Sequence, residues 1–328
     1  MIKVLKQNYK FILFLIVLVI VLNIRFPYYI NAPGGISDMS KKIDINGYDS
    51  VGSFNLAYIK EYRATIPTLI ISMFNKNWNV LKKNEVLLEE EDYKSYNLRD
   101  KILMDESISN AIYVAFNKAN KDIEIVSSKV LVAYVSKEAD TDLVAGDEII
   151  SINNNKIKSK NDITAIIDNL DIGTKTSIEV IHNEKDYTRY AYVINSENSK
   201  KIGILVSNIR EYKTSPIIHI NTEKNETGSS GGMITALTIY NSLVKEDITK
   251  GLTIVGTGTI DLDGNIGSIG GVEYKLKSAV KSKADLFIVP MDENYKEAIK
   301  LKKEKNYNID IIGVSTFDEV LEYLNNIK

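Results

Sequence analysis

The strongest hydrophobic signal lies near the beginning of the chain, where an unbroken apolar run extends from Phe11 to Leu22. Arg25 and several aromatic residues follow it, as is typical where a helix leaves a membrane at headgroup level. With these residues included, the segment 11–30 would cross roughly 30 Å at about 1.5 Å per residue. The pattern predicts an uncleaved transmembrane anchor within residues 1–30. A signal-peptide core is the alternative, although no small-x-small cleavage site follows closely.

Charges on the two sides of this run predict its orientation. Lys3, Lys6 and Lys10 precede it, whereas Arg25 is the lone cation just after it. Because the more cationic flank of a membrane span stays in the cytoplasm, we expect a cytoplasmic N-terminus and an extracytoplasmic remainder. The sequence thus predicts a single-pass protein of the cell membrane, attached through its N-terminal helix.

Short β-like runs separated by turn residues characterise the next segment, residues 31–106. Residues 53–58 and 68–73 have the composition of strands. The acidic run 89–92 is typical of a solvated face, and the segment contains no catalytic constellation. We expect this extracytoplasmic β-rich segment to join, or to shield, the sheet of the C-terminal domain.

Residues 107–196 combine a helix, several strands and a second short helix. Helical spacing of apolar residues predicts the first helix over 107–119, and a capping box at 159–162 precedes the second. The string Ala-Gly-Asp-Glu-Ile-Ile-Ser-Ile-Asn occupies 145–153, and a hairpin closes the segment at 178–194. This stretch resembles a PDZ domain, which implies binding of an extended peptide at a sheet edge. No Gly-Leu-Gly-Phe-like loop precedes Val130, so a packing module or gate is the alternative role.

Alternating strands and helices make up residues 197–328. Strands are expected at 202–206, 217–220, 286–289 and 309–314, and the runs 253–260 and 266–269 are expected to pair across a turn at 263–264. Helices are expected after Gly232, around Lys275 and after a capping box at 316–319. The predicted fold class is α+β and multidomain, with a transmembrane helix, a β-rich PDZ domain with capping helices and a C-terminal α/β domain.

A glycine-rich stretch, Gly228-Ser229-Ser230-Gly231-Gly232, opens one of these helices. Glycines around a serine allow a sharp turn and leave room for substrate, and a helix start offers backbone N–H groups to an oxyanion. Ser230 is therefore the candidate nucleophile, with Ser229 as a competitor. Both histidines, His182 and His219, precede Ser230, which excludes the nucleophile-acid-histidine order of α/β-hydrolases.

Lys275 is the candidate base. In a helix that begins near residue 272, it falls on the same stripe as Val272, Leu276 and Ala279. Burial would disfavour the charged amine and lower its pKa, as a neutral-amine base requires. The alternative is a lysine whose stem only passes its apolar neighbours on the way to solvent.

Composition narrows the chemistry. With a formal net charge of -2, the chain has no overall excess of positive charge of the kind that nucleic-acid binding requires. The chain has no cysteine and only two histidines, far apart, so we predict neither a metal site nor another cofactor. No GxxxxGK[ST] loop occurs, which predicts hydrolysis that does not depend on ATP.

Residues 222–328 resemble the proteolytic domain of Lon-type proteases. That family has a Gly-Pro-Ser-Ala-Gly motif, a Thr-Gly-Glu strand, an Ile-Gly-Gly-x-x-x-Lys helix start and a strand ending in Pro. The corresponding segments here are 228–232, 257–259, 269–275 and 287–290. The resemblance implies that Ser230 is the nucleophile, Lys275 the general base and Thr257 a hydroxyl that orients the lysine amine. The surrounding oxyanion and nucleophile loop would consist of Gly228, Ser229, Gly231 and Gly232, with Ser229 in place of the family's proline and Gly231 in place of its alanine.

Together these features predict a bacterial, membrane-anchored, PDZ-containing Lon-type serine endopeptidase that hydrolyses protein or peptide substrates outside the cytoplasm. The resemblance also implies a homo-oligomer. Two alternatives stay open. One is a catalytically silent scaffold whose PDZ domain binds a partner protein, and the other is an anion site at 228–232 in which Lys275 has no role.

Overall fold

A six-stranded sheet joins the C-terminal part of the chain to the segment that follows the N-terminal helix. The computed structural model describes residues 7–196 and 198–327. The strand order is β18-β17-β14-β3-β1-β4, and β3 pairs in parallel with β14. The strands are β1 (Tyr28–Asp38), β3 (Ser53–Arg63), β4 (Asn79–Lys82), β14 (Thr253–Gly256), β17 (Leu286–Pro290) and β18 (Asp310–Val314). The expectation that residues 31–106 join the C-terminal sheet is confirmed.

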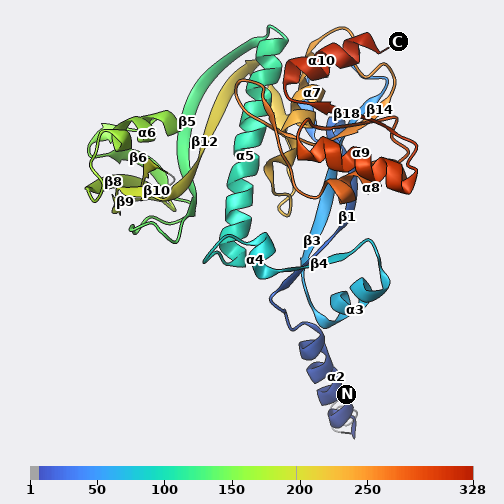
Figure 1. Ribbon diagram of the computed structural model, residues 1–328, viewed down its shortest axis with the longest axis horizontal. Helices are drawn as coiled ribbons and strands as arrows, with labels where there is room; N and C mark the ends of the chain where they lie inside the picture. The colour runs from blue at the N-terminus through green and yellow to red at the C-terminus, as the bar shows by residue number, and fades with distance from the viewer. Residues whose placement is uncertain (1–6, 197, 328) are drawn as a thin grey trace.

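Helices cover both faces of this sheet (Figure 1). Because side chains alternate between the faces of a strand, Ile254 of β14 packs with one set of helices and Val255 with the other. The first face carries α5 (Tyr93–Lys118), α7 (Gly232–Leu243) and α10 (Phe317–Asn326). The second face carries α8 (Val272–Lys281) and α9 (Glu293–Lys305). Coverage on both faces explains why β17 is buried along its whole length.

Helix α5 corrects the prediction for residues 107–119. The helix begins at Tyr93, because the Asp92 side chain accepts a hydrogen bond from the Ser95 backbone N–H and caps it. Its buried residues Val114 and Phe116 belong to the core that includes α7, so the predicted boundary at 106/107 divides a helix that packs on the six-stranded sheet. The acidic run 89–92 is likewise not a solvated face throughout, since Glu91 is buried and paired with Arg99.

A second sheet, ordered β12-β5-β6-β8-β9 with β7 paired to β6, forms the unit that the sequence likens to a PDZ domain. Its strands are β5 (Asp122–Val135), β6 (Glu148–Ile152), β7 (Asn155–Lys156), β8 (Lys175–His182), β9 (Lys185–Tyr192) and β12 (Ile204–Ser215). These strands and α6 (Lys160–Asp168), which Ser159 caps as predicted, are called the PDZ-like unit below.

The PDZ-like unit has its own apolar core and joins the rest of the molecule through the ribbon of β5 and β12 (Figure 1). Residues 202–206 were expected to begin the C-terminal domain. Instead, Ile204 starts β12, which pairs with β5 along its full length, and residue 197 lies outside the described residues. The predicted boundary at 196/197 therefore precedes a strand that completes the PDZ-like sheet.

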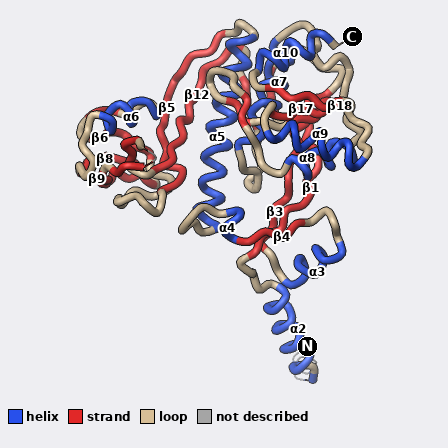
Figure 2. The backbone as a smooth tube through the Cα atoms, viewed as in Figure 1, coloured by secondary structure: helices blue, strands red, loops and turns tan. Residues whose placement is uncertain are grey.

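The base of the molecule carries α2 (Tyr9–Leu22), α3 (Ile66–Phe74) and α4 (Lys83–Val86), and α2 projects from the body (Figure 2). Residues 68–73 are helical, which corrects the predicted strand. Thr65 and Thr68 form a capping box, and Pro67 lies in the first turn, where its fixed φ favours a helix. Lys3 and Lys6, used to orient the predicted anchor, lie outside the described residues. Within 7–196 and 198–327, no helix has both the length and the apolar character needed to cross a membrane.

The remaining elements are short. They are η1 (Met39–Lys41), β2 (Ile43–Ile45), β10 (Ile194–Ser196), β11 (Ser199–Lys201), β13 (Ile218–Ile220), η2 (Ser229–Gly231), β15 (Thr259–Ile260) and β16 (Ile266–Gly267). The predicted pairing of 253–260 with 266–269 holds only for β15 and β16, because β14 enters the central sheet between β3 and β17.

Candidate active site

The nucleophile loop lies where η2 runs into α7. Gly228, at φ 95°, adopts a backbone conformation that L side chains rarely take, and the chain then turns into η2. Gly232 is needed for close packing, because a Cβ there would stand 2.4 Å from Ser107 Oγ and 2.8 Å from Ile260 Cγ2. The carbonyl oxygen of Ser230 accepts a 2.8 Å hydrogen bond from the Gly258 N–H. These contacts fix the half-buried Ser230 at the start of α7.

Lys275 reaches this loop from α8, on the opposite face of the sheet. Its Nζ lies 3.0 Å from Ser230 Oγ and 3.0 Å from Thr257 Oγ1. Ser229, the competing serine, has no hydrogen bond to Lys275 among the described residues. Ser230 is thus the serine that the fold brings to the lysine.

Thr257 determines which way the lysine amine faces. Its hydroxyl donates to the Ser230 carbonyl oxygen at 3.0 Å, so towards Lys275 the Thr257 oxygen can act only as an acceptor. A neutral amine that donates one N–H to Thr257 can turn its lone pair towards Ser230 Oγ. The three side chains therefore form a chain of hydrogen bonds with a defined direction.

The surroundings of Lys275 favour its neutral form. The side chain is 3% exposed, and it has no ion pair with a carboxylate among the described residues. Burial in this apolar setting lowers the pKa of Lys275 to about 7, since desolvation disfavours the ammonium. The alternative of a lysine that extends to solvent is wrong, because the amine ends in the core.

Helix α5 supplies contacts to the nucleophile loop that the sequence did not reveal. The Asp100 carbonyl oxygen accepts from the Gly228 N–H at 3.0 Å, and Ser107 Oγ donates to the Ser229 carbonyl oxygen at 2.8 Å. Nearby, Asn110 Nδ2 donates to the Ile260 carbonyl oxygen at 3.1 Å. Polar residues on the buried face of α5 were the available signal, but the sequence gives no indication of what they touch.

The remaining candidate groups lie apart from this site. His219 is in β13, paired in register with Asp44 of β2. His182 lies in the PDZ-like unit, where its Nδ1 is 2.8 Å from Oδ1 of the buried Asp147. Across residues 7–196 and 198–327, no three His, Cys, Asp or Glu side chains come together as a metal site.

A serine hydroxyl that is hydrogen-bonded to a buried lysine amine of lowered pKa defines the site of a Ser-Lys hydrolase. Comparison with known proteins agrees with this class. The family model of the Lon protease (S16) C-terminal proteolytic domain matches residues 145–326. The chain belongs to this family, and its class is that of the serine peptidases.

Curated relatives have the same family name. Lon protease 2 of Borreliella burgdorferi is 32% identical over 146 residues, which cover 44% of this chain and 17% of the relative. Lon protease of Rickettsia typhi is 24% identical over 323 residues, covering 89% of this chain and 37% of the relative. The chain thus spans well under half of the length of these relatives.

Two solved structures match a smaller part of the chain. They are PDZ domains of SdrC-like proteins from Listeria monocytogenes and Listeria innocua, 26% and 24% identical. Each covers 24% of this chain, and they cover 85% and 92% of their own chains, with TM-scores of 0.22 and 0.23.

Proposed function

We propose that the chain is a membrane-attached serine endopeptidase that hydrolyses extracytoplasmic proteins or peptides without ATP, with Ser230 as nucleophile and Lys275 as general base. The observation that carries the proposal is the 3.0 Å hydrogen bond between Ser230 Oγ and the buried Nζ of Lys275. In acylation, neutral Lys275 takes the proton of Ser230, and Oγ attacks the scissile carbonyl carbon. The lysine ammonium then protonates the departing amine. In deacylation, Lys275 takes a proton from the water that attacks the ester carbonyl, and the lysine ammonium then returns a proton to Ser230 Oγ as the new carboxylate leaves.

A backbone N–H group of the nucleophile loop would hold the developing oxyanion. The Gly232 N–H donates to the Ser229 carbonyl oxygen, and the Met233 N–H donates to Gly258. Because the 3-10 turn of η2 also engages the Gly231 N–H, the N–H of Ser230 is the proposed donor to the substrate oxygen.

We also propose that the PDZ-like unit selects or gates substrate through α5. One side of this helix holds the unit, since Glu106 Oε1 accepts from the Asn208 N–H of β12 at 3.0 Å and lies 2.6 Å from Lys160 Nζ of α6. Its other side holds the nucleophile loop through Ser107. Because Glu106 and Ser107 are adjacent, a peptide that shifts the unit would move the support of the loop.

Membrane attachment is proposed for α2. All of its apolar residues are at least partly exposed, and the helix buries no side chain against the rest of the described chain. The proposed orientation has the N-terminus in the cytoplasm and the catalytic site outside. Extraction of cell membranes with alkaline carbonate, followed by protease treatment of intact cells, tests both parts. Release of the full-length chain by carbonate would contradict the attachment.

Covalent labelling tests the catalytic proposal. The full chain is incubated with a fluorophosphonate probe, and the modified peptide is located by mass spectrometry beside Ser230→Ala, Ser229→Ala and Lys275→Ala. We expect label on Ser230 that persists in Ser229→Ala and disappears in the other two variants. Absence of label in a folded sample would favour the scaffold alternative. Tight phosphate binding at 228–232 that is unchanged in Lys275→Ala would favour the anion site. The oligomeric state is measured on the same sample by light scattering, and a homo-oligomer is expected.

A further inference from the structure

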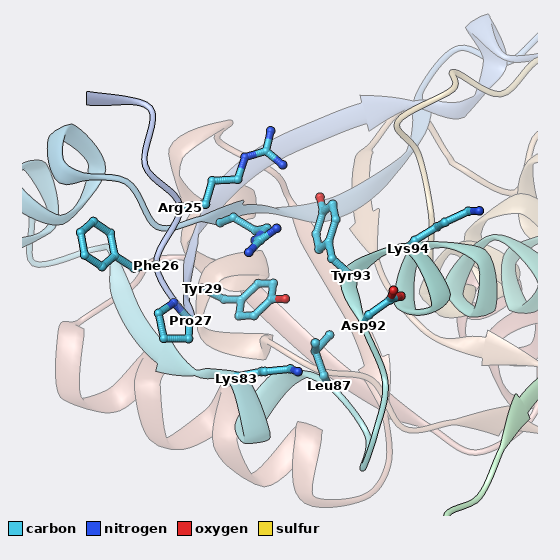
Figure 3. Close-up of a pocket in the computed structure, with 10 residues that line it drawn as sticks. Arg25, Phe26, Pro27, Tyr29, Lys83, Leu87, Asp92, Tyr93 and Lys94 are labelled. Atoms are coloured by element: carbon cyan, nitrogen blue, oxygen red, sulfur yellow. The ribbon is translucent and has the colours of Figure 1, made fainter. Parts of the chain in front are cut away.

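A pocket of about 550 Å³ opens at the base of the molecule, beside the end of α2. Its walls come from residues 25–27, which connect α2 to β1, from Tyr29 of β1 and Arg63 at the end of β3, and from α4 and the start of α5. Figure 3 shows these segments meeting around Tyr29 and Tyr93. Ser230 is not among the residues that line the pocket, and the proposed hydrolysis does not use it.

The pocket concentrates positive charge that is not neutralised by ion pairs within the described part of the chain. Four cations line it, namely Arg25, Arg63, Lys83 and Lys94. None of them has an ion pair in the described part of the chain, although many other lysines of this chain do. The one acid in the lining, Asp92, accepts from the Ser95 N–H at the start of α5, which lowers the pKa of this carboxyl. In a chain of formal net charge -2, four unpaired cations around one cavity indicate a site for an anion.

Arg63 is the most specific feature of this site. Its Nε is buried and has no hydrogen-bond partner among the described residues. Its guanidinium lies 5.6 Å from the centre of the Tyr93 ring, which in turn stacks on Tyr29 with ring centres 6.2 Å apart. A buried donor without an acceptor costs free energy unless a ligand supplies one. A guanidinium held in a fixed plane is suited to a phosphate, which can accept two parallel hydrogen bonds.

The position of the pocket identifies the source of the phosphate. Arg25 follows α2 by only a few residues, so the pocket would lie at headgroup level if α2 is in a bilayer. The neighbouring α3, which contacts α2, exposes Met73 and Phe74 by 81% and 84%. Trp78 stacks on Tyr62 at 5.9 Å on the same side of the body, as aromatic residues do at membrane interfaces. These apolar and aromatic groups favour a lipid over a free ion.

We propose that this pocket binds the phosphate of an anionic phospholipid headgroup, with Arg63 as the central donor and Arg25, Lys83 and Lys94 around it. The lipid would hold the base of the body against the bilayer and so fix the height of the active site above the membrane. This inference rests on the proposed membrane attachment through α2.

Native mass spectrometry of the full chain in neutral detergent micelles tests the proposal. The protein is titrated with dihexanoyl phosphatidylglycerol, with dihexanoyl phosphatidylcholine and with inorganic phosphate. We expect one phosphatidylglycerol per chain, bound at least tenfold more tightly than phosphatidylcholine. Arg63→Gln should weaken it at least tenfold, and Lys185→Gln, which removes a cation from the PDZ-like unit, should leave it unchanged. If Arg63→Gln does not fold, the exposed pair Lys83→Gln/Lys94→Gln replaces it, with the same direction of change.

Three results would overturn the lipid assignment. The first is phosphatidylcholine binding as tight as that of phosphatidylglycerol. The second is phosphatidylglycerol affinity that is unchanged in the pocket variants. The third is inorganic phosphate that binds as tightly as the lipid and is weakened equally by Arg63→Gln. Carbonate extraction and probe labelling on the same preparation separate this proposal from the others. If carbonate releases the chain but the chain still binds the lipid, the attachment through α2 would be contradicted and the lipid-binding role of the pocket would stand. Firm attachment with labelled Ser230 and no bound phosphatidylglycerol would contradict the pocket alone.

Discussion

Ser107 Oγ donates a 2.8 Å hydrogen bond to the carbonyl oxygen of Ser229, although 122 residues separate the two in the chain. A helix that precedes the PDZ-like unit thus holds the residue next to the candidate nucleophile, which follows that unit. The PDZ-like unit is therefore inserted between two parts of one catalytic body, and α5 contacts both. We therefore expect a movement of the unit along α5 to be felt close to Ser230.

Replacement of Ser107 by Ala should slow hydrolysis as well as destabilise the fold. Loss of one buried hydrogen bond costs about 1 kcal/mol, and a comparable loss of loop positioning in the transition state would lower kcat about fivefold. Peptide hydrolysis gives kcat and KM, and thermal unfolding gives the stability. Ser72→Ala is the control, because Ser72 also donates to a backbone carbonyl but lies in α3. A wild-type kcat for Ser107→Ala would show that this contact does not position the nucleophile.

Hydrolysis should depend on the protonation of Lys275. Because burial lowers the pKa of this amine to about 7, kcat/KM should rise with pH, pass a midpoint near 7 and then level off, as the neutral base becomes populated. A profile of kcat/KM from pH 5.5 to 9 checks this. Fluorophosphonate labelling of Ser230 should follow the same curve. A rate that falls as pH rises through 7 would rule out the neutral amine as base.

Burial of the Lys275 amine should also lower the free energy of unfolding. Its folded pKa lies below the unfolded value, so the unfolded chain binds more protons between about pH 7 and 10.5, and stability rises with pH over that window. Lys275→Met removes the cost. It should stabilise the fold more at pH 6 than at pH 9, by an additional amount on the order of 2 kcal/mol. Urea unfolding of both proteins at the two pH values measures this. A difference in free energy of unfolding between the two proteins that does not change with pH would contradict the lowered pKa of Lys275.

Thr257 should act through its hydroxyl and not through its methyl group. Thr257→Val removes both the acceptor for Lys275 and the donor to the Ser230 carbonyl oxygen, so kcat should fall about 10- to 100-fold. Thr257→Ser keeps the hydroxyl and should retain most of the rate. Kinetics of both variants, with the pH midpoint as a second readout, make the comparison. Equal rates for the two variants would show that the hydroxyl is dispensable.

The pairing of Ser230 with Lys275 could be predicted because both residues lie in an ordered set of motifs that resembles the Lon-type proteolytic domain, whereas the apolar stripe alone left the role of Lys275 open. The contacts from α5 that support the nucleophile loop could not be predicted from the sequence. Ser107 and Asn110 contact residues more than a hundred positions away in the chain. The spacing of apolar and polar residues within one helix does not show which distant residues that helix will contact. Residues 68–73 were misassigned for a related reason, because their isoleucines favour strands, whereas the Thr65–Thr68 capping box starts a helix.

Asp147, from the string that predicted the PDZ-like unit, should be essential for the stability of that unit. Its carboxylate is fully buried, lies 2.8 Å from His182 Nδ1 and accepts from the Val144 N–H at 2.9 Å, with Arg189 Nε at 3.4 Å. Asp147→Ala would remove the acceptor of the Val144 N–H and the buried carboxylate that faces His182 and Arg189, and it should destabilise the unit by about 3–5 kcal/mol. Hydrogen exchange of β6 and β8 measures this, with the exposed Asp186→Ala as control. Because α5 and α7 share a separate core with the six-stranded sheet, exchange there should change little, and equal loosening of both regions would show that they unfold as one.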